Sequence, residues 1–171
     1  IIAVSKASRA FIRHFTNKYV VVIPNGINVA DFKPEKKVYD GRSVLFVGRF
    51  VYRKGVHILL EAMRHVIKEK SDARLTIIGT GYLSSIIKVL IRAIGIADST
   101  KIMECVNKQS LIDAYHKANV FVMPSVFGES FGIVLLEAMA SLTPIVATDH
   151  GGIREIIKNG CLLYTSPSPR D

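Results

Sequence analysis

The feature that most constrains the fold is the alternation of short apolar runs with segments of helical period along the chain. Six apolar, β-branched runs predict strands, at residues 19–23, 43–47, 74–78, 101–105, 119–123 and 144–148. Segments of helical period lie before and between them, at residues 6–16, 55–70, 83–95, 108–117, 131–142 and 152–158. Because the strand runs are continuously apolar, they indicate a parallel sheet that is covered by helices on both faces. The chain is therefore predicted to be an α/β protein with a doubly wound parallel sheet.

The length of the chain, 171 residues, suits one ordinary domain with a substantial core. No apolar run approaches the ~20 residues that a membrane span requires. Ile1 is neither an initiator methionine nor the start of a signal-peptide pattern, so we expect this to be part of a longer protein. Residues 24–41 are rich in turn formers and charge and predict a linker.

The last residues of the chain, CLLYTSPSPRD (161–171), resemble the in-frame translation of a transposase-type sequencing adapter. We therefore leave them out of the fold prediction, as one leaves out a fusion scar. Cys105 is then the single genuine cysteine, and one thiol supports neither a disulfide nor a cysteine metal cluster. This cysteine usage predicts a reducing compartment, the cytoplasm.

The net charge of +9 is unevenly distributed along the chain. Residues 1–70 hold 14 Lys and Arg against 5 Asp and Glu, whereas the remainder holds 9 of each. Such a balance indicates an anionic partner, namely phosphate groups, an acidic membrane surface or nucleic acid. On a helix, Lys6, Arg9 and Arg13 would share one face, which favours a solvated face, with peripheral membrane contact as the alternative.

Cationic residues follow the strand at 43–47, in the sequence GRFVYRKG (48–55). In open α/β sheets ligands bind beyond the carboxyl ends of the strands, so these positions are candidates for chemistry. Gly48 permits close approach of the backbone to a ligand, and Arg49 offers a planar fork for phosphate oxygens. Lys54 adds a charge where a helix begins, and the amides of a helix start also favour anions. The stretch predicts a diphosphate site, with two ordinary surface charges as the alternative of equal weight.

Two carboxylates, Glu129 and Glu137, flank the start of an apolar helix after the strand at 119–123. Ser130 is a predicted N-cap, which would leave the amides of the next three residues, Phe131, Gly132 and Ile133, in the first turn. Glu129 is expected at the mouth of the crevice, where it can accept hydrogen bonds from hydroxyl groups. Glu137, about two turns along, could accept both hydroxyls of a ribose. A structural salt bridge is the alternative for Glu137.

Several motifs together resemble the glycosyl transferases group 1 (family 4) class of retaining GT-B glycosyltransferases. The pair Glu129 and Glu137 matches its E-x7-E motif. Five stretches agree with the family in order and spacing: VIPNGINVADFKP (22–34), VGRFVYRKG (47–55), LTIIGTG (75–81), PSVFGESFGIVLLEAMA (124–140) and PIVATDHGGIREII (144–157). The resemblance covers residues 1 to about 160 and implies a Rossmann-like fold, the C-terminal half of a GT-B enzyme truncated at both ends.

The resemblance also implies a domain organisation. Residues 1–18 would end the N-terminal domain and form an interdomain helix, and residues 19–41 would be a hinge strand and linker. Residues 42–160 would be an incomplete domain that binds the nucleotide sugar. The acceptor-binding domain would be absent, so we expect this piece alone to be inactive.

Roles for individual residues follow from the same resemblance. Arg49 and Lys54 would hold the diphosphate and stabilise it as the leaving group. Glu129 would contact hydroxyls of the donor sugar, and Glu137 would bind the nucleotide ribose. The backbone of four further residues would lie beside the sugar and phosphate: Gly48, Phe131, Gly132 and Ile133.

The implied reaction is transfer of a hexosyl unit from a UDP- or GDP-type sugar with retention of configuration. Negative charge would develop on the departing diphosphate, and fixed cations and helix-start amides would lower the barrier. The chain contains no Asp-x-Asp, and the family is metal-independent, so we expect neither a metal nor a cofactor. The partners would be a nucleotide sugar and an acceptor that is a glycan, a lipid or a small molecule.

Two other functions fit parts of the sequence less well. Gly79-x-Gly81-x-x-Ser84 after a strand, followed by Glu104, imitates the fingerprint of a dinucleotide-binding oxidoreductase. A basic nucleic-acid-binding module would need exposed aromatic residues among the charges, whereas the aromatic residues here fall mostly in core-like runs. The five histidines have no metal-ligand spacing, and His150 is the one expected near the crevice.

Overall fold

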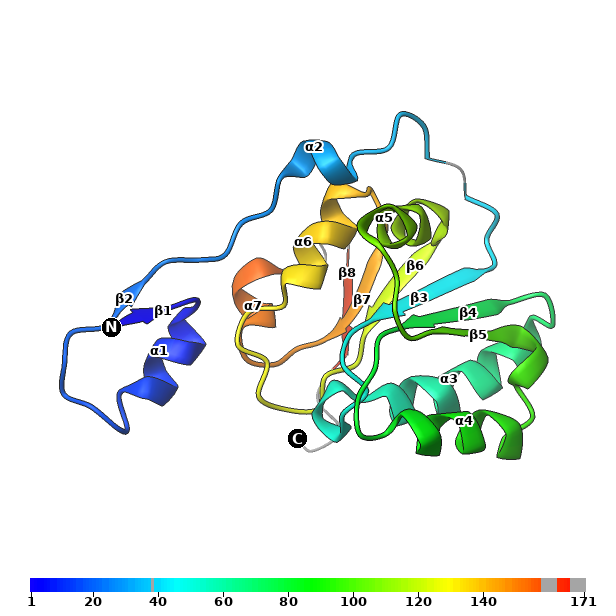
Figure 1. Cartoon of the computed structure of the whole chain (residues 1–171), viewed down its shortest axis with the longest axis horizontal. Coiled ribbons are helices and arrows are strands. Elements are labelled where there is room, and N and C mark those ends of the chain that lie inside the picture. Colours follow the sequence, from blue (N-terminus) through cyan, green and yellow to red (C-terminus); the bar gives the residue numbers. More distant parts are fainter. Residues whose placement is uncertain (38, 158–162, 167–171) are drawn as a thin grey trace.

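The computed structural model describes residues 1–37, 39–157 and 163–166. A six-stranded parallel sheet forms its centre, as Figure 1 illustrates. The strand order is β5-β4-β3-β6-β7-β8, and every neighbouring pair is parallel. The strands are β3 (Ser43–Val47), β4 (Arg74–Ile78), β5 (Thr100–Met103), β6 (Val120–Met123), β7 (Ile145–Thr148) and β8 (Leu163–Ser166). The chain adds strands in one direction from β3 to β5 and in the other from β6 to β8, so a ligand is expected at the carboxyl ends of β3 and β6.

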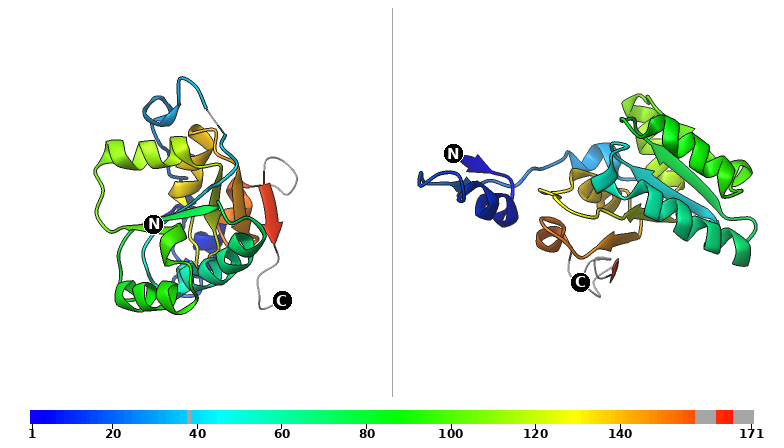
Figure 2. Two further views of the ribbon diagram at one scale, coloured as in Figure 1. Left: turned by 90° about the vertical axis from the view of Figure 1, so that its right-hand side faces the viewer. Right: turned by 90° about the horizontal axis from the view of Figure 1, so that it is seen from below.

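Helices cover both faces of this sheet, as the continuously apolar strands predict (Figures 1 and 2). One face carries α3 (Val56–Glu69) and α4 (Ser84–Ala93), and the other carries α5 (Lys108–Lys117), α6 (Ile133–Ala140) and α7 (Ile153–Ile156). Two short 3-10 helices are η1 (Tyr52–Lys54) and η2 (Ala97–Ser99). Successive residues of β3 point to opposite faces, so Leu45 belongs to the α5–α6 core and Phe46 to the α3–α4 core. The doubly wound architecture is confirmed.

The first part of the chain lies beside this domain and has a small sheet of its own (Figure 2). β1 (Ile2–Ala3) pairs in parallel with β2 (Val21–Val22), and α1 (Lys6–Ile12) lies between them in sequence. The chain then runs in an extended path to α2 (Val29–Phe32), where the buried ring of Phe32 packs on Tyr115 at 6.1 Å. The N-terminal segment, defined as residues 1–23, is thus joined to the sheet domain through the linker.

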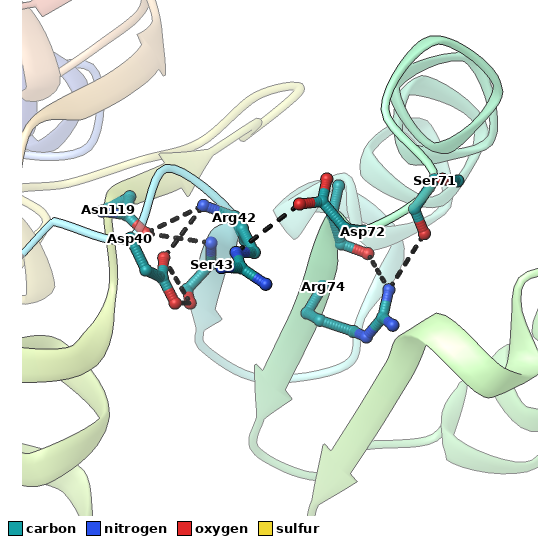
Figure 3. Close-up of polar contacts among 8 residues, drawn as sticks. Asp40, Arg42, Ser43, Ser71, Asp72, Arg74 and Asn119 are labelled. Carbon is teal, nitrogen blue, oxygen red and sulfur yellow. Dashed lines mark hydrogen bonds and ion pairs between the residues drawn. The ribbon is translucent and has the colours of Figure 1, made fainter.

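The linker is fixed to the domain at its far end. The Lys37 ammonium donates to the carbonyl of Tyr115 at 2.7 Å and to the hydroxyl of Thr143 at 2.8 Å. Burial lowers the pKa of Lys37 to about 8. Figure 3 shows how the chain then enters β3: the Asn119 side-chain oxygen accepts the amides of Arg42 and Ser43 at 3.1 and 3.0 Å. These bonds fix the register at which β3 begins beside β6.

The element bounds differ from the predicted ones mainly at the ends. All six predicted strands exist, but the one predicted at 19–23 is reduced to two residues, and β1 was not predicted. The helix predicted at 6–16 ends at Ile12, and the predicted loop at 24–41 contains α2. Residues 13–16 are exposed or only partly buried, so little packing stabilises a further helical turn there.

The tail that resembles an adapter sequence is partly described. The backbone of 163–166 forms β8 beside β7, with Ile145 opposite Leu163. Exclusion of these residues from the fold prediction therefore missed a strand, whereas their origin and the domain boundaries stay predictions. Residues 158–162 and 167–171 lie outside the described part of the chain.

Candidate functional site

The centre of the candidate site is an ion pair between Lys54 and Glu129. Lys54 Nζ donates to Glu129 Oε2 at 2.5 Å, and the Ser125 hydroxyl donates to the same oxygen at 3.2 Å. The Lys54 and Glu129 side chains are only 15% and 7% exposed. Among the described residues, the side-chain hydrogen bonds to this carboxylate all end on Oε2. Because an ammonium has three donors, Lys54 can hold Glu129 and still donate to a second anion.

Lys54 reaches this position because η1 and α3 meet the loop after β6 closely. Gly55, between η1 and α3, has a φ of 68°, which strains any residue with a side chain. A Cβ atom at Gly55 would lie 1.9 Å from the carbonyl oxygen of Pro124. Arg53 contacts the same loop, where its carbonyl accepts the amide of Val126 at 2.8 Å and its Nη1 donates to the carbonyl of Gly128 at 3.1 Å.

Glu129 is held from the opposite side by the loop after β7. The amide of Gly152 donates to the Glu129 carbonyl at 2.9 Å, and a Cβ at Gly152 would lie 2.2 Å from the Ser130 carbonyl oxygen. The amide of Gly128 donates to His150 Nε2 at 3.1 Å, which ties the residue before Glu129 to the loop after β7. The backbone that carries Glu129 is therefore fixed by both neighbouring loops.

A cavity of about 640 Å³ lies between the Glu129 loop and the N-terminal segment. Its polar wall comprises Gly128, Glu129, Ser130, His150 and Gly151. The facing wall belongs to β1 and α1 and is mainly apolar: Ile2, Ala3, Val4, Ala7, Ser8, Phe11 and Ile12. Glu129 and His150 therefore line the same cavity.

Arg49 lies in the same loop as Lys54 but lines a different, smaller cavity. That cavity has about 230 Å³ and is bounded by two arginines, one valine and three aromatic residues: Arg49, Val51, Tyr52, Arg53, Tyr82 and Phe127. The ring of Tyr52 stacks on His57 with centroids 4.8 Å apart. The sequence analysis did not predict this cluster of aromatic residues. The sequence did carry a signal for it, since each of the three aromatic residues follows the end of a strand by only a few positions.

Glu137 has a partner that the sequence did not suggest. Tyr115 on α5 donates its hydroxyl to Glu137 Oε2 at 2.8 Å, and within residues 1–37, 39–157 and 163–166 this hydrogen bond stands where the alternative expected a salt bridge. Burial raises the pKa of the Glu137 carboxyl, while the Tyr115 hydrogen bond opposes that rise. Burial and the adjacent carboxylate raise the pKa of Tyr115 well above its usual range. Glu137 is therefore held by the Tyr115 hydroxyl, whereas Glu129 is held by Lys54.

The start of α6 differs from the prediction. Gly132, with a φ of 88°, is the N-cap, and the helix begins at Ile133 instead of after Ser130. The first-turn amides are therefore those of residues 133–135, and Glu137 lies about one turn from the start. Phe131, which precedes this glycine, is buried.

The residues that imitate a dinucleotide fingerprint have structural roles. A Cβ at Gly79 or Gly81 would lie 2.0 or 2.4 Å from the carbonyl oxygen of Gly48 or Phe50, so these glycines let two loops pack together. Glu104 forms an ion pair with Lys88 at 2.6 Å. Gly48 itself donates its amide to Ile78 at 3.0 Å at the end of β3.

Within residues 1–37, 39–157 and 163–166, no group of three or more His, Cys, Asp or Glu side chains is placed to hold a metal ion. In the same residues, none of the helices has both the length and the hydropathy to cross a bilayer.

The chain is similar to known glycosyltransferases in family, sequence and structure. The sequence model of the family described as glycosyl transferases group 1 matches residues 29–171. An uncharacterized glycosyltransferase of Methanocaldococcus jannaschii is 38% identical over 161 residues, which cover 85% of this chain and 41% of that protein. A phosphatidyl-myo-inositol mannosyltransferase of Mycobacterium leprae is 35% identical, with 98% of this chain and 45% of that protein covered. The chain thus spans less than half the length of these relatives.

The fold is also that of solved glycosyltransferase structures. Anabaena HepE, crystallised with UDP and glucose, superimposes with a TM-score of 0.86 at 21% identity, covering 97% of this chain and 48% of HepE. At this identity the match supports the fold alone. The prediction of a Rossmann-like domain, one half of a GT-B fold, is confirmed.

Proposed function

The chain belongs to the glycosyl transferases group 1 family, and we propose that it is the donor-binding part of a cytoplasmic, retaining hexosyltransferase that uses a UDP- or GDP-type sugar without a metal ion. The observation that carries this proposal is the buried contact between Lys54 and Glu129 at the carboxyl edge of the sheet. A cation and a hydroxyl-binding carboxylate at one point suit the junction between a sugar and its diphosphate.

Lys54 is proposed to stabilise the leaving group. One of its three N–H donors is used by Glu129, and the others can reach phosphate oxygens as the bond to the sugar breaks. Arg49, in the preceding loop, supplies a second cation with a planar fork. In this arrangement two fixed side chains neutralise the developing charge, as a divalent ion does in metal-dependent enzymes.

The two carboxylates of the E-x7-E motif are proposed to hold the two sugars of the donor. Glu129 accepts hydrogen bonds from donor-sugar hydroxyls through Oε1, while Lys54 and Ser125 fix Oε2. Glu137 accepts ribose hydroxyls, and Tyr115 holds it in place. The backbone at Gly48, Phe131, Gly132 and Ile133 lines the route between them.

The acceptor is proposed to enter the cavity of about 640 Å³ that Glu129 shares with the N-terminal segment. The acceptor is proposed to be a glycan, a lipid or a small molecule.

Peripheral membrane contact is part of the proposal, because Phe11 and Phe15 are 67% and 76% exposed in the same segment as Arg9 and Arg13. Co-sedimentation with anionic against zwitterionic vesicles tests this contact.

Titration of this chain with UDP- and GDP-sugars by calorimetry tests the function. We expect binding in the presence of EDTA, because no metal takes part. Arg49→Ala and Lys54→Ala should each weaken donor binding by about tenfold or more, since each removes a charged contact to phosphate. Arg64→Ala, on the exposed surface of α3, is the matched control and should bind like the wild type. Equal affinity for all three variants, or preference for a dinucleotide, would contradict the proposal.

Glu129→Ala tests the chemical step in the longer reading frame that carries this chain. Turnover should fall strongly, because the donor sugar loses a hydrogen-bond acceptor and Lys54 loses its partner. Near-normal turnover would remove Glu129 from the mechanism.

A further inference from the structure

Glu155 makes a contact between the domain and the N-terminal segment that the proposed function does not use. It lies in α7, and its two carboxylate oxygens accept the amides of Lys6 and Ala7, each at 2.9 Å. These are first-turn amides of α1, which have no partner within their own helix. A carboxylate there also interacts favourably with the helix dipole.

A second contact ties the same helix to the candidate site. The Ser8 hydroxyl donates to the Ser130 carbonyl at 3.3 Å, next to Glu129. The Ser5 side chain accepts the Ser8 amide at 2.9 Å and caps α1. α1 is therefore held at its start by Glu155 and along its side by the loop that carries Glu129.

This placement decides what the segment does to the cavity. α1 and β1 form the apolar wall that faces Glu129 across about 640 Å³. The linker beyond α1 is largely exposed and extended. The position of α1 and β1 over the cavity therefore depends on the contacts that α1 makes with Glu155 and Ser130. Glu155 is itself exposed, so water can take the place of its hydrogen bonds when the contact opens.

We propose that Glu155 is a positioning residue that latches α1 over the sugar-binding carboxylate Glu129 and so keeps water from the transferred sugar; this rests on the function proposed above. With the latch closed, the oxygen of the acceptor hydroxyl bonds to the anomeric carbon, the bond to the diphosphate oxygen breaks, and the nucleoside diphosphate leaves with the hydroxyl proton. With the latch open, water attacks instead: its oxygen bonds to the anomeric carbon, the bond to the diphosphate oxygen breaks, and a free sugar, a nucleoside diphosphate and a proton result.

Hydrogen exchange on this chain tests the latch directly. In Glu155→Ala, the amides of Lys6 and Ala7 should exchange about tenfold faster or more, since two hydrogen bonds to a charged group are lost. Glu155→Gln keeps one acceptor oxygen and should give an intermediate rate. Glu69→Ala, an exposed glutamate of α3 outside these contacts, is the control and should leave both amides unchanged. Unchanged exchange in Glu155→Ala would overturn the latch.

The partition between transfer and hydrolysis tests its role. In the longer reading frame, Glu155→Ala should lower the ratio of transfer to donor hydrolysis severalfold and leave the donor Kd unchanged. Faster exchange with an unchanged ratio would overturn the positioning role and leave Glu155 a structural contact. Failure of the proposed function is a separate outcome, because the wild-type chain itself would then bind no nucleotide sugar.

Discussion

Lys54→Met is expected to destabilise the unliganded chain, because it leaves the Glu129 carboxylate buried without its cation. At a separation of 2.5 Å, two unit charges attract by roughly 6 to 7 kcal/mol at an effective dielectric of about 20. Lost hydration offsets much of this gain, and removal of one partner of a buried pair costs about 3–5 kcal/mol. Since Lys54 keeps 15% of its surface exposed, we expect about 3 kcal/mol. Methionine keeps the length of the stem, so little of the loss is due to packing.

A double-mutant cycle separates the charge effect from other causes. Glu129→Gln should cost less than Lys54→Met, about 1–2 kcal/mol, because the lysine can turn towards water and Ser125 can still donate. The double variant has no buried charge at this point and should lie within about 1 kcal/mol of the wild type. Urea unfolding at pH 7, followed by circular dichroism, gives the three differences. Costs that simply add, or a Lys54→Met cost below about 1 kcal/mol, would refute the reasoning.

Three further changes test other parts of the structure. Glu137→Gln should leave stability at pH 7 equal or higher, because burial raises the pKa of the Glu137 carboxyl and its ionised form costs stability as pH rises through that pKa. The same change should weaken nucleotide binding about tenfold. Lower stability with intact binding would contradict the ribose role. Lys37 has a pKa of about 8 against 10.5 in the unfolded chain, so the unfolded state binds more protons between these values and stability should rise over that range. Since Lys37 is partly exposed, solvent screening keeps this rise below about 1 kcal/mol, and Lys37→Met should abolish it in unfolding curves from pH 7 to 10.5. Gly152→Ala should cost about 2 kcal/mol or more because its Cβ would meet the Ser130 carbonyl oxygen, whereas Gly26→Ala, in open space, should change the unfolding midpoint little; equal midpoints would argue against tight packing of the two loops.

The site was predictable in part, for reasons that specific residues show. Glu129 and Lys54 were identified because residues that follow strands gather at one edge of a parallel sheet. Their direct contact was not predicted, since 75 positions separate them and no local pattern encodes the distance between two loops. The Ser130 cap was wrong because a left-handed glycine at 132 moved the helix start, and capping preference yields to such backbone geometry.

What the amino-acid sequence alone determined is the order of strands and helices, the family and the residue types at the edge of the sheet. These follow from short-range physics, since apolar runs and helical periods act over a few neighbouring residues. Only the tertiary structure decided which groups meet: Glu137 with Tyr115, Lys54 with Glu129, and Glu155 with the start of α1. Each of these contacts joins distant parts of the chain, and its geometry depends on how the whole core packs.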